Sequence, residues 1–208
     1  SYTLTIRDFN DCELVLSNQI TQPDDIVLDE SHQNINCFGD ASGNIDLSVA
    51  GGIVPYSFNW NNSQTTEDLS LIPAGSYEII VTDNNQCKDS LTINLTEPDA
   101  PLSVSAILTD VRCFGESTGI IDLTVIGGTA PYFYNWGNGI LSEDVNNLPF
   151  GTYQVEIEDS KGCTTSGTYT LTQPNQPLST QMSMIEPLCF GDSNGSASVL
   201  VNGGTPGY

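Results

Sequence analysis

Residues 113–136 read Cys-Phe-Gly-Glu-Ser-Thr-Gly-Ile-Ile-Asp-Leu-Thr-Val-Ile-Gly-Gly-Thr-Ala-Pro-Tyr-Phe-Tyr-Asn-Trp, and this stretch decides the fold. A closely similar stretch occupies residues 37–60, and a third copy begins at Cys189 and runs to Tyr208. Successive copies are 76 residues apart, and many single residues keep that offset. Such pairs are Trp60 and Trp136, Pro73 and Pro149, Tyr77 and Tyr153, Asp83 and Asp159, Cys87 and Cys163, and Pro98 and Pro174. The chain is therefore a tandem repeat.

The 76-residue period divides the 208 residues into two complete repeats flanked by two incomplete ones. We expect complete repeats at 26–101 and 102–177, the C-terminal part of a truncated repeat at 1–25, and the N-terminal part of another at 178–208. A unit of this size can bury a modest core of its own. It is also longer than a typical solenoid repeat, so the sequence favours separate domains arranged as beads on a string.

Apolar residues alternate with polar ones in short segments of each repeat, which is the pattern of half-buried strands. In the first complete repeat these segments are 45–49, 56–60, 77–81 and 91–95. Turn signals rich in Gly, Pro and Asn separate them, and about six or seven such strands per repeat describe a β-sandwich. We therefore expect an all-β fold of tandem immunoglobulin-like (PKD-like) β-sandwich repeats. The predicted core aromatic residues are Trp60, Trp136, Tyr77 and Tyr153.

The excess of acidic residues limits the kinds of molecule that the chain can bind. The chain has 4 Lys and Arg residues against 26 Asp and Glu residues, a formal net charge of −22. This acidity argues against binding to nucleic acid or anionic lipid. No apolar run approaches the ~20 residues that span a bilayer. We also expect an excerpt of a longer exported protein with disulfides, because the sequence has 6 Cys residues, no basic leader and no initiator Met.

A periodic chain should pair its cysteines periodically, which leaves two patterns. One lies within repeats, Cys37–Cys87 and Cys113–Cys163, and the other joins neighbouring repeats through Cys37–Cys163. In an immunoglobulin-like strand order, Cys37 and Cys87 lie at opposite poles of a sandwich, roughly 25–30 Å apart. A disulfide spans Cα atoms within about 7 Å. We therefore favour Cys37–Cys163, and the within-repeat pattern remains the alternative because the strand order is itself inferred.

The sequence offers no catalytic or cofactor-binding machinery. His32 is the single histidine, and its counterpart one repeat later is Leu108, so it belongs to no repeated site. Nucleophilic and acid–base catalysis usually need such a base within hydrogen-bond reach. The Gly-Gly turns lack the lysine and helix of a phosphate loop. We therefore expect no enzyme and no cofactor.

Calcium is the one metal for which residues can be named. The acid- and amide-rich turns have a loose resemblance to oxygen-ligand loops, but the EF-hand spacing is absent. The simpler interpretation is a glycine-bearing turn with surface acids. The weak candidates are Asp40, Asn44, Asp46, Glu116 and Asp122.

The recurring blocks together resemble the SprB repeat. They are Cys-Phe-Gly-Asp/Glu, Gly-Gly-x-x-Pro-Tyr-x-x-x-Trp, Leu/Ile-Pro-x-Gly-x-Tyr and Asp-x-x-x-Cys. The resemblance covers essentially the whole chain. It implies a very long cell-surface adhesin of gliding Bacteroidota, exported by the type 9 secretion route and located outside the outer membrane. It carries over no catalytic or ligand-binding residue.

The resemblance implies a structural and adhesive role, with neighbouring repeats of the same chain as partners and a surface or polysaccharide as target. Multivalency would turn a weak contact per repeat into firm attachment. The alternative is an array of carbohydrate-binding modules in a secreted polysaccharide-degrading protein. Exposed, coplanar Tyr or Trp side chains on one face would favour that alternative, and buried ones would favour the stalk.

Overall fold

The computed structural model describes residues 1–208, and its regular secondary structure consists only of β-strands. The chain divides into two compact units. Unit 1 comprises residues 1–35 and 40–96, and unit 2 comprises residues 36–39 and 97–208. The short segment 36–39 thus packs with unit 2. The structure has no helix of the length and apolarity needed to cross a membrane.

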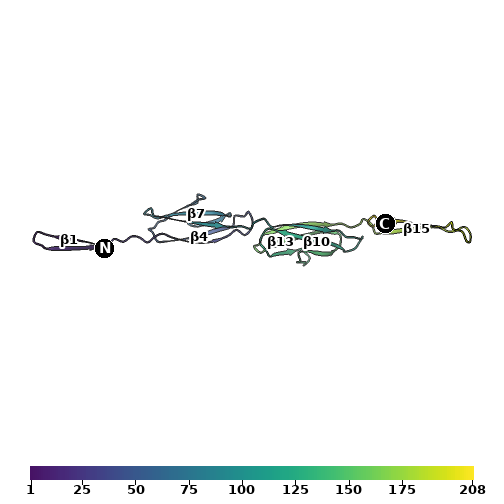
Figure 1. Ribbon diagram of the computed structural model, residues 1–208, viewed down its shortest axis with the longest axis horizontal. Coiled ribbons are helices and arrows are strands. Elements are labelled where there is room, and N and C mark those ends of the chain that lie inside the picture. The colour runs from purple at the N-terminus through teal and green to yellow at the C-terminus, as the bar shows by residue number, and fades with distance from the viewer. The chain divides into compact units, whose positions relative to one another are not determined.

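Unit 1 contains a sandwich of two antiparallel three-stranded sheets, drawn as separate layers with β4 and β7 labelled in Figure 1. One sheet has the strand order β3-β4-β6 and the other β5-β7-β8. The strands are β3 (Val27–Gln33), β4 (Gly43–Ala50), β5 (Ser57–Trp60), β6 (Leu69–Ile72), β7 (Gly75–Thr82) and β8 (Lys88–Leu95). The hairpin of β1 (Tyr2–Arg7) and β2 (Glu13–Asn18) also belongs to this unit.

Unit 2 repeats the same sandwich, with β10 and β13 labelled in Figure 1. Its sheets have the orders β9-β10-β12 and β11-β13-β14. The strands are β9 (Ser103–Thr109), β10 (Gly119–Ile126), β11 (Tyr132–Asn135), β12 (Val145–Leu148), β13 (Gly151–Asp159) and β14 (Thr164–Leu171). The hairpin of β15 (Ser179–Ile185) and β16 (Ser196–Asn202) completes it. In each sandwich the first, second and fourth strands form one sheet and the third, fifth and sixth form the other, which corresponds to A-B-E against C-F-G in immunoglobulin lettering.

The core is formed by the apolar residues that alternate with polar ones along the strands. In β4, Ile45 and Leu47 are buried while Asp46 and Ser48 are exposed, as the two faces of a strand require. Trp60 enters the same core from β5 and is 1% exposed. The remaining buried residues of this cluster are Ile35, Leu69, Ile72, Tyr77, Ile79, Val81, Ile93 and Leu95.

The core of unit 2 uses the corresponding positions around Trp136, which is 8% exposed. Tyr153 differs from its expected place. It is half-buried and packs against the cluster rather than within it, whereas Tyr77 in unit 1 is 7% exposed. Both hydroxyls reach out of the core and donate to a carbonyl, Tyr77 to Pro73 and Tyr153 to Pro149.

The strand patterns missed the first strand of each sandwich. β3 carries Asp29, Glu30 and His32, and it pairs only with β4, at the edge of its sheet. An edge strand that buries few side chains needs little apolar alternation, so periodicity gives a weak signal there. The same reason applies to β15, which precedes the strand expected to be first in the last segment.

Candidate functional site

The aspartate of the Asp-x-x-x-Cys motif forms a buried hydrogen-bond centre in unit 2. Asp159 is 1% exposed. Its Oδ1 accepts hydrogen bonds from the backbone N–H groups of Lys161 and Cys163 at 2.8 and 2.9 Å. Its Oδ2 accepts from the N–H of Thr129 at 2.8 Å. One carboxylate therefore closes the turn between β13 and β14 and ties it to the loop that follows β10.

Asp83 does the same in unit 1. Its Oδ1 accepts from the N–H groups of Asn85 and Cys87 at 2.8 and 2.9 Å, and its Oδ2 accepts from Ile53 at 3.0 Å. In the hairpin of β1 and β2, Asp8 accepts from Asn10 and Cys12, both at 2.8 Å. The motif thus fixes the backbone around each hairpin cysteine by the same chemistry.

The pKa values of both buried aspartates lie below the ordinary value for this side chain. Burial acts to raise the pKa of Asp159, but hydrogen bonds from the backbone of Cys163, Thr129, Lys161 and Gly162 outweigh it and lower the pKa below 3.8. The pKa of Asp83 is lowered in the same way, against a raising effect of burial. These recurring acids are therefore held as hydrogen-bond acceptors for the backbone.

A disulfide joins Cys37 to Cys163 within unit 2, with Cα atoms 5.7 Å apart. Cys163 follows the turn that Asp159 closes, so the aspartate fixes the backbone that presents the sulfur. The carbonyl of Asn36 also lies 3.4 Å from the Sγ atom of Cys163. The segment 36–39 is thereby held against the β13–β14 turn. This is the pair that the inferred strand order favoured, and peptide mapping remains its test.

A side chain at the end of each repeat holds the Cys-Phe-Gly loop. The N–H of Gly39 donates to Oε2 of Glu97 at 2.6 Å, and the N–H of Gly115 donates to Oε1 of Gln173 at 2.7 Å. The two bonds are one repeat apart in sequence. The loop is thus braced whether or not its cysteine is in a disulfide.

The within-repeat disulfide alternative is not the pattern found. Cys87 and Cys113 are exposed free thiols, as are Cys12 and Cys189. Cys163, which that alternative would pair with Cys113, is bonded to Cys37 instead. The physical reason is the strand order, because Cys37 follows β3, the first strand of the sandwich, while Cys87 lies between β7 and β8, the last two strands.

The two tryptophans and Tyr56 are not free to stack on a sugar. Trp60 and Trp136 are buried, and each indole Nε1 donates to a backbone carbonyl, that of Thr66 or Ser142, at 2.9 Å. Tyr56 is half-buried and its hydroxyl donates to the carbonyl of Gly51. These rings serve the core and its loops.

The five calcium candidates do not come together as a ligand cluster. All five side chains are exposed. No group of three or more His, Cys, Asp or Glu residues in the structure is arranged to hold a metal ion. Asp46 and Asp122 lie on the outward faces of β4 and β10, where alternation places polar side chains.

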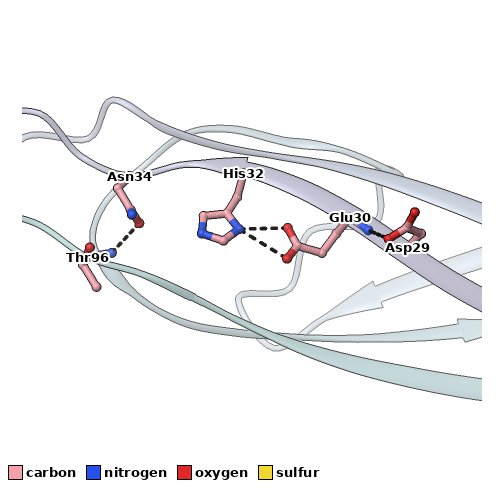
Figure 2. Close-up of polar contacts among 5 residues, drawn as sticks. All are labelled: Asp29, Glu30, His32, Asn34 and Thr96. Carbon is pink, nitrogen blue, oxygen red and sulfur yellow. Dashed lines mark hydrogen bonds and ion pairs between the residues drawn. The ribbon is translucent and has the colours of Figure 1, made fainter.

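His32 is paired locally rather than poised over a pocket. Its Nδ1 lies 2.9 Å from Oε2 of Glu30 on the same strand, as Figure 2 shows. Beyond it, Asn34 Oδ1 accepts from the N–H of Thr96 at 2.8 Å and closes the end of the sandwich.

Sequence reasoning missed a second set of recurring acids. Asp68 accepts from the N–H of Leu47 at 3.0 Å, and Asp144 accepts from the N–H of Leu123 at 2.9 Å. Each reaches the middle of a neighbouring strand. The 76-residue offset between these aspartates was the available signal.

Comparison with known proteins identifies the repeated unit. The sequence model of the SprB repeat matches residues 30–65, 105–140 and 186–208, which include all three Cys-Phe-Gly loops. No curated protein matches the chain. SprB repeats are associated with cell-surface proteins, so in general terms the chain is a repeat segment of a cell-surface adhesin. The chain thus contains three segments that match the SprB repeat family.

Proposed function

We propose that the chain is a structural and adhesive segment of a very large cell-surface adhesin filament that serves surface attachment and gliding motility. The protein is exported by the type 9 secretion route and acts outside the outer membrane. Its partners are neighbouring repeats of the same chain and a surface or polysaccharide target. It catalyses no reaction and needs no cofactor.

One observation supports this proposal: the residues that recur in each repeat stabilise the fold, by core packing, by backbone hydrogen bonds or by a disulfide. The tryptophans fill cores, and the motif aspartates accept backbone hydrogen bonds. Cys37 and Cys163 are joined to each other. A disulfide adds stability chiefly by limiting the unfolded chain, although the mechanism depends on the model used. Such a framework suits a filament that must transmit force without unfolding.

The location can be tested with antibodies raised against the 208-residue chain. We expect them to label intact cells of the source bacterium, and the label to move along the cell as it glides. Cells without the type 9 export machinery should keep the protein inside and lose both label and movement. Label that appears only after the cells are permeabilised would contradict the proposal.

A further inference from the structure

The long central strand of the β5-β7-β8 sheet, and its counterpart in unit 2, extends beyond a short neighbour. β5 pairs with residues 79–82 of β7, and β11 pairs with residues 156–159 of β13. The first half of β7 and of β13 therefore has a partner on one side only. Because antiparallel strands alternate the direction of their backbone groups, every second residue there points at an open edge.

Unit 1 covers this edge with Asn61. The N–H of Asn61 donates to the carbonyl of Glu78 at 2.9 Å, and its Nδ2 donates to the carbonyl of Ser76 at 3.0 Å. One asparagine thus satisfies both carbonyls on that side of β7. Edge strands are commonly protected in this manner, since an open edge is a template for another strand.

Unit 2 leaves the same edge open. Gly137 stands where Asn61 stands and has no side chain. Its φ is +86°, and its N–H donates to Oδ1 of Asn135 instead, at 3.0 Å. The residues equivalent to Ser76 and Glu78 are Thr152 and Gln154. Neither receives the hydrogen bonds that Asn61 supplies in unit 1.

A groove of about 580 Å³ lies beside this open edge. It is lined by residues 135–138 and by residues of β13 and β14. Its polar lining includes Asn138, Gln154 and Ser166, and Glu156 is its only charged side chain. The chain as a whole carries a net charge of −22. Charge complementarity therefore favours a cationic occupant and opposes a second copy of this chain.

We propose that the open edge of β13 at Thr152 and Gln154 binds a short extended peptide of net positive charge, which adds to the sheet as a strand. Backbone N–H and C=O groups of the peptide would pair with those of Thr152 and Gln154, as in other strand-addition complexes. A Lys or Arg side chain of the peptide would reach Glu156. The site exists in unit 2 and is closed in unit 1, and it does not depend on the proposed role in gliding.

The test titrates the ¹⁵N-labelled 208-residue chain with a blocked pentapeptide of sequence Lys-Thr-Val-Thr-Lys and follows amide chemical shifts. We expect the largest shifts at Thr152, Gln154 and Gly137, and weaker binding as salt is raised. The same peptide with Glu in place of Lys should not bind. A neutral oligosaccharide, cellohexaose, is the third probe.

Two exchanged variants give matched controls. Gly137→Asn restores the cap of unit 1 and should weaken binding by roughly tenfold or more, the effect of losing two hydrogen bonds. A side chain there meets no atom within 4 Å, but the φ of +86° strains any residue other than glycine, and asparagine is among the residues that tolerate this region best. Asn61→Gly should create a second site, with new shifts at Ser76 and Glu78. The new binding site in Asn61→Gly would test the proposal even if Gly137→Asn does not fold.

The other outcomes overturn the proposal. Peptide binding that survives Gly137→Asn, or a null result with Asn61→Gly, would show that the cap does not control the edge. Equal binding of the Glu peptide would remove the electrostatic argument. Shifts at this groove with cellohexaose and none with the Lys peptide would assign the groove to a glycan.

Discussion

The two sandwiches share their strand order and the residues that fix the backbone, and they differ in surface residues at one sheet edge. Both have the same strand orders, the same aspartate centre at Asp83 or Asp159, and a buried tryptophan. They differ in the sheet that carries the open edge, where Asn61 of unit 1 is replaced by Gly137 of unit 2. The comparison teaches that backbone-fixing groups define the repeat, while single substitutions on the framework change its surface.

A compensated change in the same sheet supports this. Leu91 and Ile93 of β8 correspond to Gly167 and Tyr169 of β14. A Cβ atom added to Gly167 would lie 2.5 Å from Oη of Tyr169, so the tyrosine ring occupies the space that a side chain at 167 would need. The larger residue at one position is thus matched by the loss of a side chain two residues earlier.

The largest expected effect comes from truncating the tryptophans. Trp60→Ala and Trp136→Ala should each destabilise their own unit by about 3–5 kcal/mol, the usual cost of removing a large core aromatic. The cost should be greater for Trp60, because Trp136 is the more exposed of the two. Hydrogen-exchange mass spectrometry in increasing denaturant would follow the two units separately.

Trp60→Phe and Trp136→Phe serve as controls, since they keep a ring but lose the indole hydrogen bond. They should cost less than the alanine variants. A loss below about 1 kcal/mol for either alanine variant would show that the ring does not carry the core.

The next largest effect is a loss of folding stability at low pH. The folded-state pKa values of Asp83 and Asp159 lie below the ordinary value of 3.8, so both carboxylates stabilise the fold above that pH. This stability should be lost as the pH falls below 3.8 toward the depressed values. Asp159→Asn should cost about 1–3 kcal/mol at pH 7, because the amide offers only one acceptor to three N–H groups. Asp83→Asn should act in the same direction.

Both variants should also flatten the acid limb of the stability curve, which thermal unfolding between pH 2 and pH 7 would record. Asp46→Asn is the matched control, since this aspartate is exposed on β4. An unchanged acid limb in Asp159→Asn would mean that its ionisation does not support the fold.

The smallest effect separates Leu71 from Asn147, which occupy the same position in β6 and β12. Both have positive φ, 54° and 55°, a conformation that asparagine tolerates better than leucine. Leu71 is 79% exposed, so its side chain contributes little packing. Leu71→Asn should therefore stabilise unit 1 by about 1 kcal/mol or less, and Asn147→Leu should destabilise unit 2 by a similar amount. Denaturation midpoints that move in the reverse directions would count against this reading.

Much of the fold could be predicted from the sequence because apolar and polar residues alternate along most of its strands. Segments such as 45–49 and 77–81 bury one face, and the structure has β4 and β7 there. The strand order also follows from the immunoglobulin-like pattern. The edge strand β3 could not be predicted in this way, because a strand with one neighbour and few buried side chains needs little alternation.

The site was harder to predict than the fold. The recurrence of Asp83 and Asp159 was visible, but one of the three backbone partners of each is brought to it only by folding, since Ile53 and Thr129 are 30 residues away from them. The difference between Asn61 and Gly137 was visible too. Its consequence, an uncovered edge on β13, arises because β5 and β11 end before their neighbours do. No local sequence pattern predicts where they end.

The most direct test of the account is a disulfide map of the oxidised chain. Cleavage after Lys, Arg and Glu places Cys37, Cys87 and Cys163 in different peptides. The account predicts a linked pair that contains Cys37 and Cys163, which disappears in Cys163→Ser and persists in Cys189→Ser. A linked pair that joins Cys37 to Cys87 would contradict both the disulfide and the strand order on which the account depends.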